Sequence, residues 1–348
     1  MLRPRLEWLL VFVPVAFVLE FTHAAPVAIF LVAALAILPL AGQIGHATED
    51  LAIRAGPQAG GLLNATFGNV TEMIIAVFLI IEGELEVVKA SITGSIIGNV
   101  LLVLGLSFLI GGWTRTEQEF NRRSAGLHST SLVIAVVALL MPALFHLTPE
   151  ASEFREEAVS IGVAIILIAV YGLSLLFSFK THKSLFVSAE HEDETPKWSL
   201  KFAVGLLAGS TVLVAVMSEF LVGALEPTVE EWGVSKLFVG LIIVPIVGNA
   251  AEHSSAILFA AKNKMDVAIE IAIGSSTQIA LFVAPMLVFI SLLLGEPMNL
   301  IFSGIEISAV AFSAAILAFI ALDGRSTWIE GAQLLAAYVI MAVSFFFL

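Results

Sequence analysis

The sequence predicts a polytopic all-α membrane protein, and three observations support this fold class. Of the 348 residues, 59% are hydrophobic and 13% are charged, and the mean hydropathy is +1.02. Apolar stretches of about 20 residues, enough for a helix to cross a bilayer, recur from end to end. The stretches are apolar on every face, unlike the alternating strands of membrane β-barrels. The composition excludes soluble enzyme folds and nucleic-acid binders.

The breaks between these stretches define eleven expected transmembrane helices. Residues 1–24, with Arg3 and Arg5 before an apolar run, also fit a signal peptide. A first span followed directly by ten more is the commoner arrangement, and we expect that one. The spans are 8–22, 25–42, 58–81, 87–111, 126–146, 157–179, 199–222, 236–260, 266–294, 299–321 and 327–347.

The basic residues predict a cytoplasmic N-terminus, because cytoplasmic loops retain Lys and Arg. The outer side then keeps only Lys89, Arg155 and Lys236, together with acidic clusters such as 82–86 and 226–231. An acidic mouth would concentrate cations, although solvated loop ends explain any single Glu equally well. The inner side receives Arg3, Arg5, Arg54, Arg115, Arg122, Arg123, Lys180, Lys183, Lys197, Lys201, Lys262, Lys264 and Arg325.

Two spans carry a nearly identical polar motif inside an apolar helix. Span three contains GNVTE from Gly68 to Glu72, and span eight contains GNAAE from Gly248 to Glu252, an offset of 180 positions. Polar groups inside the hydrocarbon are costly unless they have a partner or a function. The offset continues in the matched pairs Ala76 and Ala256, Val87 and Val267, Gly94 and Gly274, Ser95 and Ser275, Leu101 and Leu281, and Val103 and Val283.

The offset indicates an internal duplication. We expect an extra N-terminal helix at 1–24, a five-helix repeat at 25–180, a charged cytoplasmic linker at 181–198, and a second repeat at 199–348. Because five is odd, the second repeat crosses the membrane in the opposite direction. Inverted repeats are typical of secondary transporters, which bind substrate at the repeat interface and expose it alternately.

The motif chemistry predicts a cation site. Its glycines weaken the helix and free backbone carbonyls, its asparagines add neutral oxygens, and each glutamate follows three residues later on the same helix face. Two carboxylates and several neutral oxygens suit a hard divalent cation, above all Ca²⁺ with six to eight oxygen ligands. The predicted metal ligands are Gly68, Asn69 and Glu72 with Gly248, Asn249 and Glu252.

The paired carboxylates also predict exchange. Without metal, two close carboxylates in a medium of low dielectric constant cannot both stay ionised, so Glu72 and Glu252 are expected to bind protons in place of Ca²⁺. A helix crossing held by hydrogen bonds is the alternative. It explains one buried glutamate better than two at symmetric positions.

Neighbouring residues are candidates for a supporting role. Asn99 has Ile279 at the matching position of the second copy, so that half lacks an equivalent amide. His253 points about 100° away from Glu252 on a helix, which favours a proton relay or a packing role over ligation of a hard cation. Small and hydroxyl residues also commonly pack membrane helices. The supporting set is Ser95, Asn99, Ser275, Gln278 and His253.

Three further acids lie within or near spans. We expect that Glu270, a turn inside the cytoplasmic end of span nine, lines the inner route, whereas contact with interfacial water explains Glu219 and Glu306 equally well.

The segments GHATEDLAIRAG, GGLLNATFGNVTEMIIAVFLI and GNAAEHSSAILFAAKNKMDVAIEIAIGSSTQIALFVAP resemble the calcium/proton antiporter family, a branch of the cation/calcium exchanger superfamily. In that family the two GNxxE motifs are the cation selectivity segments, so the resemblance implies that Glu72 and Glu252 bind Ca²⁺ and protons in turn. Many eukaryotic members begin with a long extension, so we expect a prokaryotic type in the cell (inner) membrane. The resemblance also implies acids between the halves, which Glu190, Glu192, Asp193 and Glu194 supply.

The expected function is therefore Ca²⁺/H⁺ antiport by alternating access. Its partners are Ca²⁺, H⁺ and the lipid bilayer, with no nucleic acid and no cofactor, and homo-oligomerisation stays open. A Na⁺/Ca²⁺ exchanger is the main alternative, and a passive cation channel is a weaker one. An enzyme is not expected, since the sequence has no HExxH motif and no evident base beside the GSS of span nine.

Overall fold

The computed structural model describes residues 6–182 and 195–348 and is almost entirely helical there. Arg3, Arg5 and the linker acids at 190–194 lie outside the described residues. The first half contains η1 (Leu6–Val11), α1 (Phe12–Phe21), α2 (Pro26–Phe67), α3 (Val70–Ile81), α4 (Leu85–Ile97), η2 (Gly98–Val103), α5 (Leu104–Gly112), β1 (Gln118–Glu119), α6 (Arg122–His146), α7 (Glu153–Leu176) and η3 (Phe177–Thr181). The second half contains α8 (Leu200–Gly223), α9 (Leu225–Trp232), α10 (Lys236–Phe238), η5 (Val239–Ile243), α11 (Val244–Gly248), α12 (Ala250–Ala261), α13 (Met265–Gln278), η6 (Ile279–Val283), α14 (Ala284–Leu294), α15 (Gly304–Ile320), β2 (Arg325–Ser326) and α16 (Trp328–Phe346).

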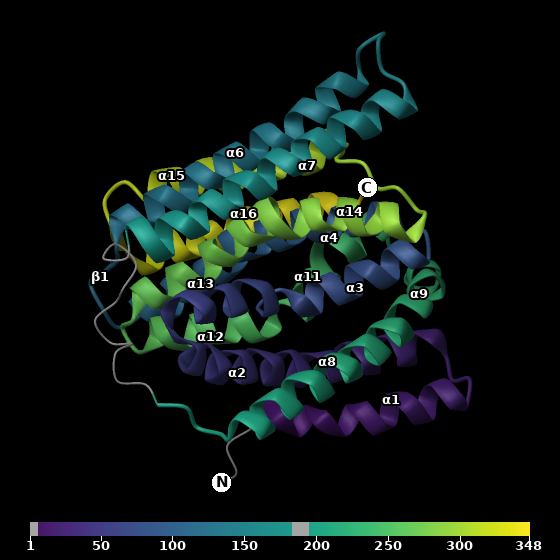
Figure 1. Ribbon diagram of the computed structural model, residues 1–348, viewed down its shortest axis with the longest axis horizontal. Coiled ribbons are helices and arrows are strands. Elements are labelled where there is room, and N and C mark those ends of the chain that lie inside the picture. Colours follow the sequence, from purple (N-terminus) through teal and green to yellow (C-terminus); the bar gives the residue numbers. More distant parts are fainter. Residues whose placement is uncertain (1–5, 183–194) are drawn as a thin grey trace.

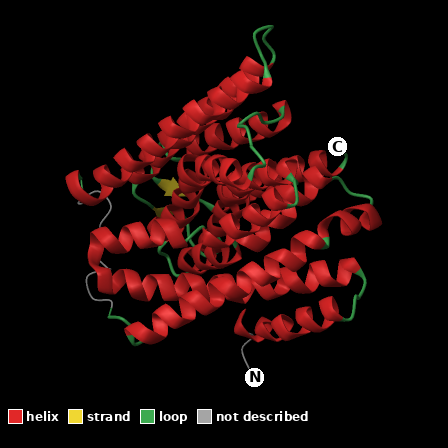
Figure 2. Cartoon of the chain, turned by 45° about the vertical axis from the view of Figure 1, so that its right-hand side comes forward, coloured by secondary structure: helices red, strands yellow, loops and turns green. Residues whose placement is uncertain are grey.

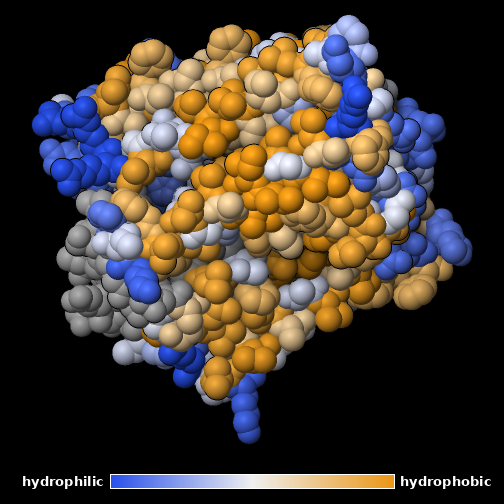
Figure 3. Space-filling view, turned by 45° about the horizontal axis from the view of Figure 1, so that its top comes forward, coloured by the Kyte–Doolittle hydropathy of each residue, from blue (hydrophilic) through white to orange (hydrophobic). Residues whose placement is uncertain are grey.

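The helices confirm a multi-pass, all-α membrane protein. Within the described residues, seven helices are long and apolar enough to cross a bilayer, and a pair bent by 115°, α9 with α10–α11, raises the number to eight. The shorter apolar helices α3 and α15 fall below that length. A broad apolar band covers the middle of the surface, with polar residues toward both ends (Figure 3). The count of eleven spans stays a prediction.

The helices lie in three layers in Figure 1, and Figure 2 shows the same bundle from another side. Helices α1, α2 and α8 form the bottom layer, where α2 and α8 share the most extensive helix contact of the described chain. Helices α6, α7 and α15 form the top layer. Between them lie α3, α4 and α11–α14, which carry the two motifs and the polar residues beside them.

Helix starts are set by local side-chain caps. Asn121 accepts hydrogen bonds from two backbone N–H groups at the start of α6, and Ser199 does so from one at the start of α8. Helices α15 and α16 begin with complete capping boxes, Ser303 with Glu306 and Thr327 with Glu330. The cap places Glu306, which is 4% exposed, where its carboxylate is already hydrogen-bonded to Ser303 and to Thr93 of α4. The expectation that Glu306 reaches interfacial water was wrong.

Span two is longer than the predicted 25–42, because the helix continues to Gly56 before the chain reverses. Gly56 has φ 78° and ψ 173°, a conformation that strains any L side chain. After the turn Gly60 lies against Ala52, where an added Cβ would come within 2.3 Å of the backbone oxygen. The glycines thus permit the sharp reversal that leads into the first motif.

A buried acid stabilises the part of α2 that ends at the Gly56 kink. Asp50 is 4% exposed, and its carboxylate accepts hydrogen bonds from the backbone N–H groups of Lys197 (2.5 Å) and Trp198 (3.1 Å) and from Arg54 Nε (3.2 Å). These contacts fix the chain just before α8 to the end of α2. Asp50 is therefore a buried anchor for this part of the chain and not a solvated loop acid.

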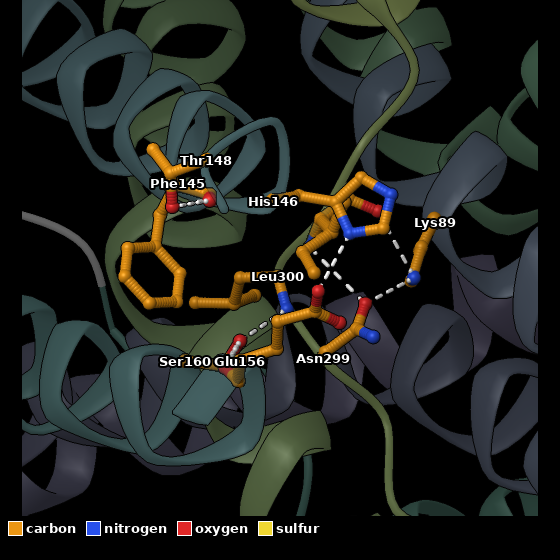
Figure 4. A network of polar contacts seen from close by, with 9 residues as sticks. Lys89, Phe145, His146, Thr148, Glu156, Ser160, Asn299 and Leu300 are labelled. Carbon is orange, nitrogen blue, oxygen red and sulfur yellow. Dashed lines mark hydrogen bonds and ion pairs between the residues drawn. The ribbon is translucent and has the colours of Figure 1, made fainter. Parts of the chain in front are cut away.

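The connection between α14 and α15 is held by a polar network (Figure 4). Lys89 of α4 donates to Asn299 Oδ1 (2.5 Å) and to the Ile301 backbone oxygen (3.0 Å). The backbone N–H of Leu300 donates to Ser160 Oγ of α7 at 2.9 Å. This extended segment of the second half is thereby anchored to two helices of the first half.

At the other end of the bundle, β1 and β2 form a short antiparallel ribbon that the sequence did not predict. Gln118 pairs with Ser326 and Glu119 with Arg325, joining the α5–α6 connection to the α15–α16 connection. Arg325 also forms an ion pair with Glu117 at 3.1 Å. Both ends of the bundle thus carry contacts between the two halves of the chain.

Candidate cation-binding site

Both motif helices break at the asparagine of the motif. Asn69 (φ −99°, ψ 12°) separates α2 from α3, and Asn249 (φ −103°, ψ 8°) separates α11 from α12. Gly68 itself keeps helical angles, so the break lies one residue after the glycine that is expected to weaken the helix. Glu72 and Glu252 lie in the first turn of the helix that follows each break, where the helix dipole favours a negative charge.

Glu72 is 8% exposed and is bound by groups from both halves of the chain. Its Oε1 accepts hydrogen bonds from Ser95 Oγ of α4 and from Asn249 Nδ2 of the second motif. Its side chain packs on Gly248, where an added Cβ would come within 2.9 Å of Glu72 Cγ. The first glutamate thus lies directly against the second motif.

Glu252 has the reciprocal environment. It is partly exposed, and its carboxylate is hydrogen-bonded to Ser275 of α13. An added Cβ on Gly68 would come within 3.4 Å of Glu252 Oε1. Each glutamate therefore lies against the glycine of the other motif, and the two acids converge on one place, as the duplicated motif predicts.

The second carboxylate oxygen of each glutamate is available to a ligand. Glu72 Oε2 and Glu252 Oε2 are buried, and no group among the described residues donates a hydrogen bond to either. Nor does any Lys or Arg of the described chain form an ion pair with these two acids. A carboxylate oxygen that is buried in an apolar setting without a partner costs roughly several kcal/mol of stability. A bound cation or a proton would remove that cost.

Neutral oxygens surround the pair. Asn69 Nδ2 donates to Gln278 Oε1 at 2.7 Å, and Ser275 Oγ is 3.4 Å from Asn69 Oδ1. Asn99 Nδ2 donates to Ser275 Oγ at 3.2 Å. Carboxylate, amide and hydroxyl oxygens are the ligands that Ca²⁺ prefers. The structure thus brings together both motifs with Ser95, Asn99, Ser275, Gln278 and, through Asn99, His253.

One predicted acid lies away from this cluster. Glu270 contacts Ser124 Oγ (2.7 Å) and His128 Nε2 (3.1 Å), both on α6, at the packing contact between α6 and α13. The side chain of Glu270 is about half exposed, 49%, and the expectation that it lines the inner route stays a prediction.

Sequence reasoning missed two features of the site. Helices α4 and α13 each continue into a π-helical turn, η2 at 98–103 and η6 at 279–283, at matching positions of the two halves. A π turn inserts one extra residue and rotates the side chains beyond it, and such turns are frequent at functional sites. The sequence also gave no sign that Asn249 would bind the glutamate of the other motif.

This geometry is typical of one class of protein: membrane transporters built from two related halves whose polar motifs meet in the middle of the bundle. The model of the sodium/calcium exchanger protein family matches two stretches of the chain, residues 25–180 and 202–347. The chain belongs to the sodium/calcium exchanger family.

Several of the similar proteins are named Ca(2+)/H(+) antiporters. A Ca(2+)/H(+) antiporter of Aphanothece halophytica is 46% identical over 355 residues, covering 97% of this chain and 95% of the relative. The Ca(2+)/H(+) antiporter ChaA of Bacillus subtilis (strain 168) is 46% identical over 342 residues, covering 97% of both chains. The solved structure of native YfkE superposes with a TM-score of 0.87 at 42% identity and covers 99% of this chain and 100% of YfkE.

Proposed function

We propose that this protein is a secondary active antiporter that exchanges Ca²⁺ for H⁺ across a membrane. The observation that carries the proposal is the convergence of Glu72 and Glu252, each with one buried, unpaired carboxylate oxygen, within a ring of neutral oxygens. Similarity to proteins named Ca(2+)/H(+) antiporters over nearly the whole chain supports the same function.

The site residues act as follows. Glu72 and Glu252 supply two negative charges that balance one Ca²⁺, with Asn69, Asn249 and nearby backbone at Gly68 and Gly248 completing an oxygen cage. When two protons neutralise the carboxylates, the cage loses both its charge and its affinity for the metal. Ca²⁺ and protons therefore occupy the site in turn. No covalent chemistry is required, so the protein is a transporter and not an enzyme.

The proposed topology has eleven spans with the N-terminus in the cytoplasm. One helix at 1–24 precedes two inverted five-helix repeats, 25–180 and 199–348, which a cytoplasmic linker at 181–198 joins. The offset of 180 between the motifs and the double family match support this division. Alternating access then exposes the shared site to each side. We place the protein in the cell (inner) membrane, where inward proton flow drives Ca²⁺ extrusion.

Flux into proteoliposomes tests the function. With sodium absent, a pH gradient should drive ⁴⁵Ca²⁺ uptake that saturates with Ca²⁺ and releases protons in exchange. Uptake that requires a sodium gradient would instead make the protein a Na⁺/Ca²⁺ exchanger. Non-saturating flux with no coupled proton movement would make it a passive channel.

A further inference from the structure

Asn99 joins the two halves of the site, although it belongs to neither motif. It lies in the π-helical turn η2, is 1% exposed, and uses both ends of its amide. Oδ1 lies 2.9 Å from His253 Nε2, and Nδ2 lies 3.2 Å from Ser275 Oγ. Both partners come from the second half of the chain. The matching position there is Ile279, so this contact has no symmetric copy.

The direction of these hydrogen bonds follows from the donors available. An Asn amide alone can face either way, because its oxygen and nitrogen are similar in shape. A hydrogen on His253 Nε2 requires Asn99 to present Oδ1, which turns Nδ2 toward Ser275. Ser275 Oγ then accepts from Asn99, and its own hydrogen is shared between Asn69 Oδ1, 3.4 Å away, and the Glu252 carboxylate. Glu252 Oε2 is buried and has no partner among the described residues.

In the first half of the site, an amide also donates a hydrogen bond to the serine beside the glutamate, but this amide belongs to the motif itself. There Asn249 Nδ2 donates to Ser95 Oγ at 3.1 Å and also to Glu72 Oε1, so the motif asparagine supplies the amide. In the second half the motif asparagine Asn69 directs its Nδ2 to Gln278 instead. Asn99 supplies the missing donor.

We propose that Asn99 and His253 are positioning residues for Ca²⁺ binding, acting through Ser275. His253 orients Asn99, Asn99 orients the Ser275 hydroxyl, and that hydroxyl holds the predicted ligands Asn69 and Glu252 in place around the cation. Neither residue contacts the ion. This inference rests on the proposed Ca²⁺/H⁺ exchange.

The test is Ca²⁺ transport by purified variants in proteoliposomes, with KM and Vmax measured separately. His253→Met, which copies Met73 at the matching position, removes the donor and should raise KM about three- to tenfold, as expected for losing one neutral hydrogen bond. Vmax should change little. His253→Gln keeps an N–H donor and should restore KM to within about twofold of the unmodified protein.

Asn99→Leu, which is close in shape but has no amide, should raise KM as much as His253→Met. The double variant should be no worse than either single variant, because both changes break one chain of hydrogen bonds. Ser276→Ala is the matched control, since Ser276 is buried beside Ser275 but its hydroxyl bonds only its own helix at Ala272.

Three results would overturn the inference: additive effects of the two changes, a His253→Gln variant as defective as His253→Met, or losses confined to Vmax. Thermal unfolding of each variant in detergent separates misfolding from a change of affinity. Absence of pH-driven Ca²⁺ transport by the unmodified protein would instead reject the proposed function.

Discussion

Gly248 offers a direct test of how closely the two motifs meet. In Gly248→Ala the new methyl would lie 2.9 Å from Glu72 Cγ, whereas carbon atoms prefer separations of about 3.5–4.0 Å. Glu72 must therefore withdraw by roughly 0.6–1.1 Å. The tolerated range of Ca²⁺–oxygen distances, about 2.3–2.6 Å, is narrower than that shift.

We expect Ca²⁺ affinity to fall about 10- to 100-fold, the loss typical of a displaced group beside a metal ligand. Folding should be affected less, because overpacking costs about 1–3 kcal/mol while replacing a helical Gly by Ala contributes about 0.5–1 kcal/mol in the opposite direction. The control is Gly274→Ala, since an added Cβ there would meet nothing within 4 Å.

The assay is equilibrium ⁴⁵Ca²⁺ binding to both purified variants, with thermal unfolding measured in parallel. Weak binding by Gly248→Ala and normal binding by Gly274→Ala is the expected pair of results. Unchanged affinity in a folded Gly248→Ala variant would refute the packing of Glu72 against the second motif.

Three further changes have distinct expected outcomes. Glu72→Gln or Glu252→Gln should abolish pH-driven Ca²⁺ uptake while the protein still folds, and near-normal flux by either would remove that residue from the site. Gly94→Ala should lower the thermal stability and the yield of folded protein, because the added Cβ would come within 2.2 Å of the Leu241 backbone oxygen at the contact of α4 with η5. A normal unfolding temperature would show that these helices can move apart with little loss of stability. Asp50→Asn should destabilise the protein by about 1.5–3 kcal/mol, the range for hydrogen bonds to a charged group, with the Ca²⁺ KM unchanged; a shifted KM would link this anchor to the cation site.

Much of the site could be predicted because the internal duplication is visible in the sequence as a constant offset between the two motifs. The motifs at Gly68 and Gly248, the buried acids and their convergence all follow from one offset and from the cost of placing carboxylates in hydrocarbon. Ser95, Ser275 and Gln278 could be predicted as polar residues on the neighbouring spans four and nine, and each contacts a motif residue.

The pairing within the site could not be predicted, because it depends on how the two halves pack. Spacing along one helix suggests that Asn69 assists Glu72, yet Glu72 binds Asn249 and Asn69 binds Gln278. The π-helical turn that carries Asn99 has no sequence signal that distinguishes it from an ordinary α-helix. Only the folded structure shows which residue each asparagine amide is hydrogen-bonded to.

The limits of span two also could not be predicted from hydropathy. The polar run ending at Asp50 looks like a loop, yet it is helical because Asp50 is satisfied by Arg54 and by the backbone of residues 197–198. Arg54 is four positions from Asp50, but residues 197 and 198 lie more than 140 positions away in the sequence. A long-range hydrogen bond thus overrides a local signal.

The most direct measurement is the affinity of the purified protein for Ca²⁺ across a series of pH values, with the Glu72→Gln variant beside it. Competition at the shared carboxylates predicts that acidification displaces bound Ca²⁺ from the unmodified protein and that the variant binds weakly at every pH. Tight binding that does not change with pH, or that survives loss of Glu72, would contradict the exchange of metal for protons at this site.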